Sequence, residues 1–217
     1  MGCGSIVPRS LGAGPLNALV SGFEVPRLGE RMSIALALAQ AWEPSALHCA
    51  SRPDLERLAQ TAAGRVPAEG LGCLVTGGQN ALASHAQPAL EALDTWLAGH
   101  RLADEAAALI GLGPGLTPSG DDYFGGMLIA LRALERGQRA QSLWRWLEPR
   151  LAEGTSELSA AHLAAAAAGE GHEALHACLA ALCANEELET PLDRLGGIGH
   201  CSGWDALAGA LAVLRSA

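Results

Sequence analysis

The chain has 217 residues, of which 49% are hydrophobic and only 4% aromatic, and its formal net charge is −9. This length and composition exclude a disordered chain and suffice for one large or two small domains with a buried core. The negative charge argues against nucleic acid or an anionic membrane as the main partner, because both attract basic surfaces. All 14 basic residues are arginine, which excludes mechanisms that need a Schiff-base or phosphate-loop lysine.

The first residues, MGCGSIVPRS, lack the charged and apolar regions of a signal peptide. The longest apolar runs are much shorter than the ~20 residues of a membrane span. We therefore expect a soluble, cytoplasmic protein. The six cysteines contain no C-x-x-C pair, and in a chain without a secretory signal we expect small buried hydrophobes or free thiols rather than disulfides.

Residues 1–78 carry short apolar runs separated by glycine and proline, a pattern typical of strands. We expect strands over 18–25, 32–39, 45–50 and 71–77. One helix is predicted over 54–64, where apolar residues recur at helical spacing and a glycine follows.

From residue 79 onward helical spacing dominates. The predicted helices cover 88–99, 102–111, 120–136, 138–151, 156–169, 172–184 and 203–216. The sequence therefore predicts an α+β fold, with a small β-rich subdomain over 1–78 followed by a larger, mostly helical subdomain over 79–217.

A motif recurs within the helical part. SGDDYFGG (119–126) and SGWDALAG (202–209) align without gaps, 83 residues apart. The aligned pairs are Ser119 with Ser202, Gly120 with Gly203, Asp122 with Asp205, and Gly126 with Gly209. Each copy follows a glycine-rich turn, GLGPGLTP or GGIGHC, and opens an apolar helix.

Two interpretations of this motif remain open. Ser-x-x-Asp before an apolar run is typical of a capping box, in which Ser119 caps the helix and Asp122 reaches back to it. A cap does not explain the glycines and prolines that precede it, nor the additional acid Asp121. Successive glycines indicate backbone near a ligand or in left-handed conformations, so we favour a functional site.

The chemistry of such a site is constrained by what the motif lacks. A phosphate loop needs a lysine, and the dinucleotide fingerprint needs glycine where Leu116 stands. Two carboxylates more than offset the partial positive charge of a helix N-terminus, so a bare anion would bind poorly. A Mg²⁺-bridged phosphate or a ligand with N–H donors suits the site better. Asp122 and Asp205 would then line one pocket, with Thr117 and His200 just above them.

A zinc site is the second chemical alternative. His172-Glu173-x-x-His176 matches the H-E-x-x-H pattern, in which two histidines hold zinc and the glutamate acts as base. Glycines flank Glu170 and place His172 at a helix start, unlike the long helix that such enzymes use. The alternative interpretation is a surface helix without a metal, in which an acid near the N-terminus interacts favourably with the helix dipole.

The segments GLGPGLTPSGDDYFGGMLIAL (111–131), Thr155-Ser156-x-x-Ser159 with Gly169-Glu170, and GGIGHCSGWDALAG (196–209) resemble the AllH-like family. The resemblance covers about residues 100–217. It implies a subunit of oxamate carbamoyltransferase in anaerobic allantoin breakdown, which transfers a carbamoyl group between carbamoyl phosphate and an oxamate-like acceptor. It also implies that activity needs partner subunits or a homo-oligomer.

The matched positions define the candidate site. Asp122, Asp205 and His200 are the expected catalytic residues. The expected substrate-binding residues, which share the motif turns and helix starts, are Gly113, Gly115, Thr117, Ser119, Gly120, Asp121, Thr155, Ser159 and Ser202. The alternatives are a non-catalytic binding or assembly subunit, and the zinc-dependent hydrolase described above.

Overall fold

The computed structural model describes residues 44, 46, 47, 49 and 52–216, and every regular element in this part of the chain is helical. The elements are α1 (Leu55–Ala62), η2 (Gly72–Thr76), α2 (Ala81–Leu97), η3 (Asp104–Leu109), α3 (Ser119–Ala133), α4 (Gly137–Gly154), α5 (Glu157–Ala168), α6 (Glu173–Ala184), α7 (Glu189–Gly196) and α8 (Ser202–Arg215). Here η denotes a 3₁₀ helix.

The predicted α+β fold is therefore wrong for the described residues. The expected strand over 71–77 is the 3₁₀ helix η2, and residues 46, 47 and 49 of the expected strand over 45–50 form no strand. A Cβ atom on Gly72 would lie 2.6 Å from the Cβ of Trp204, so this segment packs closely against α8 as a 3₁₀ helix. The expected strands over 18–25 and 32–39 lie outside the described residues.

The predicted helices agree with the structure better than the predicted strands do. The helices expected at 54–64, 120–136, 138–151, 156–169, 172–184 and 203–216 are confirmed as α1, α3, α4, α5, α6 and α8. The helix expected at 88–99 begins earlier, because Asn80 caps α2 by accepting from the backbone N–H of Ala83. The segment expected as a helix over 102–111 is the 3₁₀ helix η3, and the short α7 was not predicted.

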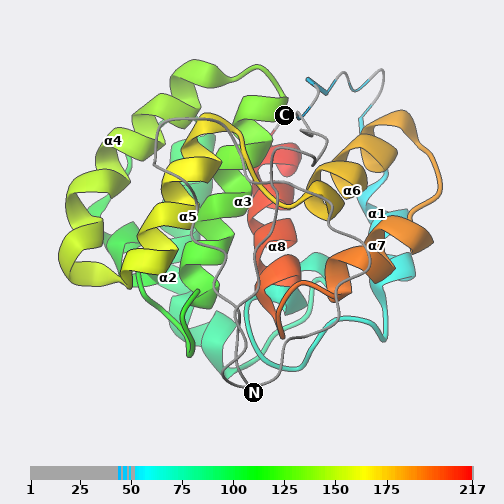
Figure 1. The fold of residues 1–217 in the computed structure, drawn as a ribbon, viewed down its shortest axis with the longest axis horizontal. Helices are drawn as coiled ribbons and strands as arrows, with labels where there is room; N and C mark the ends of the chain where they lie inside the picture. Colours follow the sequence, from blue (N-terminus) through cyan, green and yellow to red (C-terminus); the bar gives the residue numbers. More distant parts are fainter. Residues whose placement is uncertain (1–43, 45, 48, 50–51, 217) are drawn as a thin grey trace, which may run out of the picture. The chain divides into compact units, whose positions relative to one another are not determined.

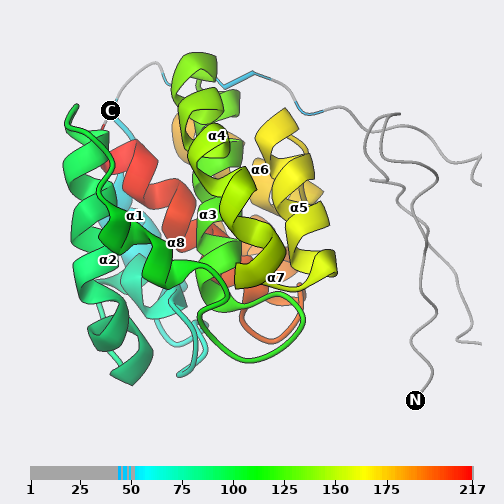
Figure 2. The same cartoon turned by 90° about the vertical axis from the view of Figure 1, so that its left-hand side faces the viewer.

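Helices α3 and α8 lie side by side at the centre of this helical unit (Figures 1 and 2). Helix α3 also contacts α4 and α5, whereas α8 contacts η2, α6 and α7. Both helices are mostly buried, and their apolar side chains, including the fully buried Phe124, Leu128 and Leu211, form the middle of the core.

The two central helices touch backbone to backbone through the echoed glycines. A Cβ atom on Gly126 would lie 1.7 Å from the carbonyl oxygen of Ala206, and one on Gly209 would lie 1.8 Å from that of Tyr123. Tyr123 and Ala206 are themselves equivalent positions of the two motif copies. The contact is therefore reciprocal, as a local two-fold relation between α3 and α8 requires.

The same relation extends to the helix starts. A Cβ atom on Gly120 would lie 1.9 Å from the carbonyl oxygen of Leu109, at the end of η3. A Cβ atom on Gly203, the equivalent glycine of the second copy, would lie 2.3 Å from the carbonyl oxygen of Leu195, in the last turn of α7. Each copy therefore consists of a short helix, a turn and a long central helix packed closely together.

The expectation of free cysteines is wrong at one pair. Cys49 and Cys183 form a disulfide, with Cα atoms 4.4 Å apart. Their 134-residue separation carries no local spacing signal that could have predicted the pair. Cys73, Cys178 and Cys201 are free thiols, as expected.

Candidate functional site

The echoed serines do not cap their own helices. Ser119 and Ser202 are the first residues of α3 and α8, and the preceding N-cap residues, Pro118 and Cys201, make no side-chain cap hydrogen bond. The capping-box interpretation of the motif is therefore wrong. The serine and aspartate side chains are left for interactions between the two helices.

These side chains pair across the helix interface. The Ser202 hydroxyl faces Asp122 and the Ser119 hydroxyl faces Asp205, and each hydroxyl lowers the pKa of the carboxyl that it faces. Thr117 also lowers the pKa of Asp122, and its Oγ1 lies 3.1 Å from the Oγ of Ser202. Each carboxylate thus faces the serine of the other motif copy, and this interface brings five of the predicted site residues together: Thr117, Ser119, Asp122, Ser202 and Asp205.

Asp205 is buried and Asp122 is half-buried, and each carboxylate has one buried oxygen without a hydrogen-bond partner among the described residues. Among the described residues, neither Asp122 Oδ2 nor Asp205 Oδ2 has a hydrogen-bond partner, although both atoms are buried. Burial raises the pKa of Asp122 to about 8, with a contribution from the charge of Asp205, while hydrogen bonding from Ser202 and Thr117 opposes the shift. Two acids with buried, unpartnered oxygens need a ligand, a proton or a cation to satisfy them.

Burial likewise raises the pKa of Asp205 to about 6, against the hydrogen bond from Ser119. Asp205 is only 1% exposed, because a loop before η2 covers it. Its Oδ1 accepts hydrogen bonds from the backbone N–H groups of Leu71 at 2.6 Å and Gly72 at 2.8 Å. The pKa of Asp122 is therefore raised further than that of Asp205, so Asp122 keeps its proton to higher pH.

Asp121 has a different environment from its neighbour Asp122. Its Oδ1 accepts from the backbone N–H of Gly111 at 2.9 Å, and its Oδ2 accepts from Ser159 Oγ at 2.7 Å and from Thr155 Oγ1. These contacts join the start of α3 to the start of α5. The predicted residues Asp121, Thr155 and Ser159 therefore form a buried cluster that holds two helix ends together.

The glycine-rich turn before α3 is required by its geometry. Gly111 and Gly113 have φ values of +70° and +113°, which side-chain-bearing residues rarely adopt. A Cβ atom on Gly111 would lie 2.2 Å from the carbonyl oxygen of Gly154, and one on Gly113 would lie 3.0 Å from the backbone nitrogen of Ser119. Gly115 also has a positive φ, of +98°, with open space around it.

His200 lies at the exposed end of the second motif. Its Nε2 is 3.3 Å from Glu69 Oε2, and the Cys201 Sγ is 3.6 Å from the backbone oxygen of Glu69. Burial and the charges of Asp205, Glu69 and Asp122 raise the pKa of the Cys201 thiol to about 11. His200 is thus next to the carboxylate site through Cys201, with its side chain largely in solvent.

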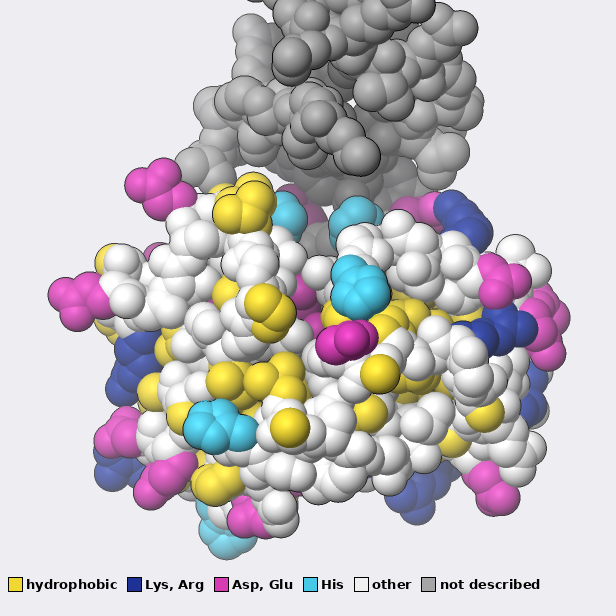
Figure 3. All heavy atoms as spheres, turned by 90° about the horizontal axis from the view of Figure 1, so that it is seen from below, with side chains coloured by type: hydrophobic (Ala, Val, Ile, Leu, Met, Phe, Trp, Pro, Cys, Tyr) yellow, Lys and Arg dark blue, Asp and Glu magenta, His cyan; other side chains and the backbone are white. Residues whose placement is uncertain are grey.

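Figure 3 views the molecule from the end at which α3 and α8 begin. Hydrophobic and histidine side chains occupy the centre of this face, where one histidine lies against an acidic side chain. Arginine side chains lie toward its edges. This distribution agrees with the two motif segments, neither of which contains an arginine.

The zinc pattern in α6 does not assemble a metal site in the described part of the chain. Glu173 is paired with Arg194, whose Nη1 donates to Glu173 Oε1 at 3.0 Å. His176 is buried, and burial lowers its pKa to about 4. Neither His172 nor His176 belongs to a group of three potential ligands among the described residues.

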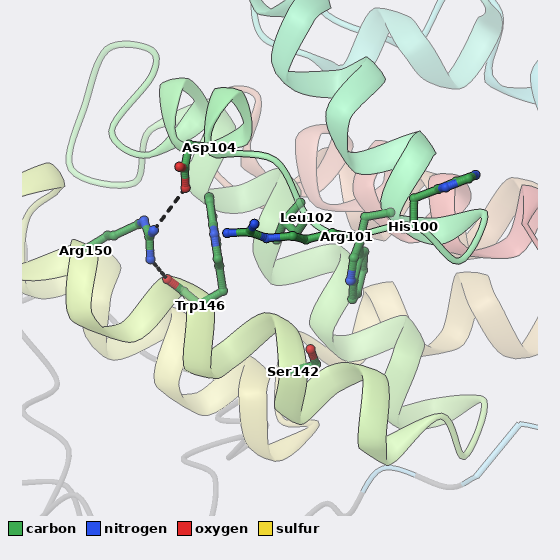
Figure 4. A pocket seen from close by; sticks show the side chains of 8 residues that line it. His100, Arg101, Leu102, Asp104, Ser142, Trp146 and Arg150 are labelled. Carbon is green, nitrogen blue, oxygen red and sulfur yellow. Dashed lines mark hydrogen bonds and ion pairs between the residues drawn. The ribbon is translucent and has the colours of Figure 1, made fainter.

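A separate hollow of about 360 Å³ lies between the end of α2, η3 and α4 (Figure 4). It is lined by Trp96, His100, Arg101, Leu102, Asp104, Ser142, Trp146 and Arg150. Arg150 lies over the Trp146 ring, 4.3 Å from its centroid, and 3.4 Å from Asp104 Oδ1. None of the predicted site residues lines this hollow.

Sequence reasoning missed the loop that completes the site. Glu69, Leu71 and Gly72 contact the second motif from 131 to 134 positions away. Asn80 fixes this loop by donating from Nδ2 to the backbone oxygens of Ala68 at 3.0 Å and Gly70 at 2.8 Å. From the sequence alone, Gln79-Asn80 after Gly77-Gly78 fits a turn and a polar site element equally well.

In the described part of the chain, the fold and this geometry define a helical unit in which two related helix–turn–helix segments meet at a pair of carboxylates. Residues 109–214 match the family model described as Oxamate carbamoyltransferase subunit AllH. The match confirms the resemblance read from the motifs. No curated protein and no solved structure matches the chain. Among the described helices, none has both the length and the apolar character needed to cross a bilayer.

Proposed function

We propose that this chain is a carbamoyltransferase subunit in which Asp122 and Asp205 bind the carboxamide group of a carbamoyl donor or an oxamate-like acceptor. The observation that carries the proposal is the crossed pairing of Ser119 with Asp205 and Ser202 with Asp122. This pairing places each carboxylate against the serine of the other motif copy, while one buried oxygen of each carboxylate has no hydrogen-bond partner among the described residues. The family description supports the reaction class.

The two acids complement a carboxamide. An amide presents one carbonyl acceptor and N–H donors side by side, and a protonated acid can donate whereas an ionised one can only accept. The raised pKa of Asp122 suits it to donate to the carbonyl oxygen. The lower pKa of Asp205 suits it to accept from the N–H group.

The same arrangement suits transfer. In the reaction, the acceptor amide nitrogen forms a bond to the carbamoyl carbon, the bond from that carbon to the phosphate oxygen breaks, and the nitrogen loses a proton. Asp205 would take that proton. Asp122, with the Thr117 and Ser119 hydroxyls, would stabilise the negative charge that develops on the carbonyl oxygen.

The phosphate and the acceptor carboxylate need positive charge that the motifs do not provide. Segments 111–131 and 196–209 contain no arginine, and the chain has no lysine. We infer that a partner subunit supplies the missing cations. This explains why the chain would need partners for activity.

The test uses the chain assembled with its partner subunits, carbamoyl phosphate and oxamate. Asp122→Asn and Asp205→Asn should each lower turnover by about 10²-fold or more, because each removes a proton donor or acceptor. Asp104→Asn, a change at an exposed acid outside the site, is the matched control and should leave turnover unchanged. Wild-type turnover in an assembled, folded Asp122→Asn enzyme would contradict the proposal.

The alternative is an assembly subunit whose motif serves packing alone. The reciprocal glycine contacts between α3 and α8 favour it, since they need no ligand. In that case the Asp122→Asn enzyme would assemble and turn over normally, and oxamate binding measured by calorimetry would be unchanged.

A further inference from the structure

Three side chains with different donor atoms meet beside the carboxylate pair. Glu69, His200 and Cys201 each offer one donor atom, and these oxygen, nitrogen and sulfur atoms all lie within 4.8 Å of one another. Among the described residues this is the group of three that could hold a metal ion. The geometry points to a Zn²⁺ site formed by Glu69, His200 and Cys201 at the entrance to the carboxylate pair.

The backbone that carries these donors is fixed. His200 and Cys201 immediately precede α8, so their positions follow from that buried helix. The loop bearing Glu69 is fixed on both sides of that residue, because the Asn80 side chain donates to the backbone oxygens of Ala68 and Gly70. The N–H groups of Leu71 and Gly72 donate to Asp205.

Gly70 lets the loop approach the start of α8 more closely than a residue with a side chain could. Its φ of +80° is left-handed, and a Cβ atom there would lie 2.6 Å from Asp205 Oδ1 and 3.0 Å from the Cys201 Cβ. The loop therefore lies directly on the start of α8. Only the exposed side chains of Glu69 and His200 must rotate to bring donors to the roughly 3.5 Å separation that one zinc ion imposes.

The charge at this position favours a divalent cation. The carboxylates of Asp205, Glu69 and Asp122 all act on the Cys201 sulfur. The adjoining motif segment, 196–209, contains no arginine. Asp205 also keeps a buried Oδ2 without a partner among the described residues, while it is itself 1% exposed. A cation at the entrance would offset this concentration of negative charge.

The donor set selects the metal. Mg²⁺ and Ca²⁺ prefer oxygen ligands, whereas a thiolate and an imidazole with one carboxylate suit Zn²⁺. Three protein ligands also leave a fourth position open, as in zinc sites that bind a substrate or water. An open position would let the ion hold a phosphate or carboxylate oxygen, which the motifs provide no arginine to bind. That consequence rests on the proposed function, whereas metal binding itself does not.

The experiment measures metal binding by the full chain without substrates. Chelator-treated protein is titrated with Zn²⁺ by calorimetry and with Co²⁺ by absorption spectroscopy, which reports a thiolate bound to the metal. We expect one metal per chain and a thiolate-to-cobalt charge-transfer band. Cys201→Ser should abolish the band, and His200→Ala and Glu69→Gln should each weaken Zn²⁺ binding tenfold or more.

Matched controls separate this site from other thiols and histidines. Cys73→Ser changes another half-buried free thiol, and His176→Ala removes a histidine of the α6 pattern. Both should leave the stoichiometry and the charge-transfer band intact. The proposal is overturned if no stoichiometric binding occurs, or if binding survives in Cys201→Ser and His200→Ala. Those outcomes leave the carbamoyl-transfer assay of Asp122→Asn unaffected, so the two proposals fail separately.

Discussion

Asp121 and Asp122 are adjacent in the sequence, yet their carboxylates have different hydrogen-bonding environments in the structure. Asp121 faces the hydroxyls of Thr155 and Ser159 and the N–H of Gly111, so both of its oxygens are occupied. Asp122 faces α8 and keeps Oδ2 unpartnered among the described residues. Because neighbouring residues on a helix point about 100° apart, the two carboxyl groups reach different helices. The sequence marked both acids as unusual but could not divide them into a structural and a chemical one.

Because burial raises the pKa of Asp122, we expect the free energy of unfolding to fall as the pH rises. The folded pKa of Asp122, about 8, lies above the usual value of 3.8, so the folded state holds a proton that the unfolded chain releases. This contribution is fully present below pH 3.8 and is lost progressively as the pH rises toward 8. Asp122→Asn imitates the protonated acid at every pH, and it should stabilise the fold at pH 8 by roughly 1 to 3 kcal/mol.

Urea unfolding of the wild type and Asp122→Asn at several pH values tests this expectation. The difference in unfolding free energy should be small near pH 4 and should grow toward pH 8. Glu91→Gln, on the exposed side of α2, is the control and should show no such trend. A difference independent of pH would mean that Asp122 is ionised in the folded protein.

At the scale of elements, the contact between α3 and α8 depends on two glycines that no larger residue can replace. Gly126 and Gly209 each meet a carbonyl oxygen of the other helix, and backbone cannot move aside as a flexible side chain can. We expect Gly126→Ala and Gly209→Ala each to lower the unfolding free energy by about 3 kcal/mol or more.

Gly125, one residue away on α3, is the matched control. A Cβ atom there would meet only the Ala166 Cβ at 3.9 Å and the Leu163 Cδ2 at 4.0 Å, which are ordinary contacts. Gly125→Ala should therefore leave stability unchanged or raise it by about 0.5 to 1 kcal/mol, the usual gain from replacing glycine inside a helix. Equal melting temperatures for all three variants would disprove the close helix contact.

The elements differ in how far the sequence could predict them. The long helices follow from apolar spacing and from stops such as Gly169, which ends α5 in the left-handed conformation. The 83-residue echo correctly paired α3 with α8. The apolar run at 71–77 has no decisive period, and as a 3₁₀ helix it packs against Trp204, which is remote in sequence. The serines suggested caps because local spacing cannot reveal a partner on another helix.

At the scale of the whole described unit, the remaining features that the sequence did not predict are long-range contacts. The loop at Glu69 reaches a motif more than 130 positions later. The Cys49–Cys183 disulfide spans 134 positions and joins the segment before α1 to α6. Leu47, near this disulfide in the sequence, donates from its backbone N–H to the carbonyl oxygen of Ala133 at the end of α3. Such contacts depend on the completed fold, so no local pattern encodes them.

The disulfide should stabilise the described unit as a whole. A cross-link that closes a long loop restricts the unfolded chain, and typical contributions are about 2 to 4 kcal/mol. We expect a reductant to lower the unfolding free energy of the wild type by about this amount. Cys49→Ser should start from the lower value and show no further response to reductant, whereas Cys73→Ser should respond as the wild type does, since Cys73 is a free thiol. Denaturant titrations with and without reductant measure the difference. Equal unfolding curves for the wild type in both conditions would show that the Cys49–Cys183 link does not contribute to stability.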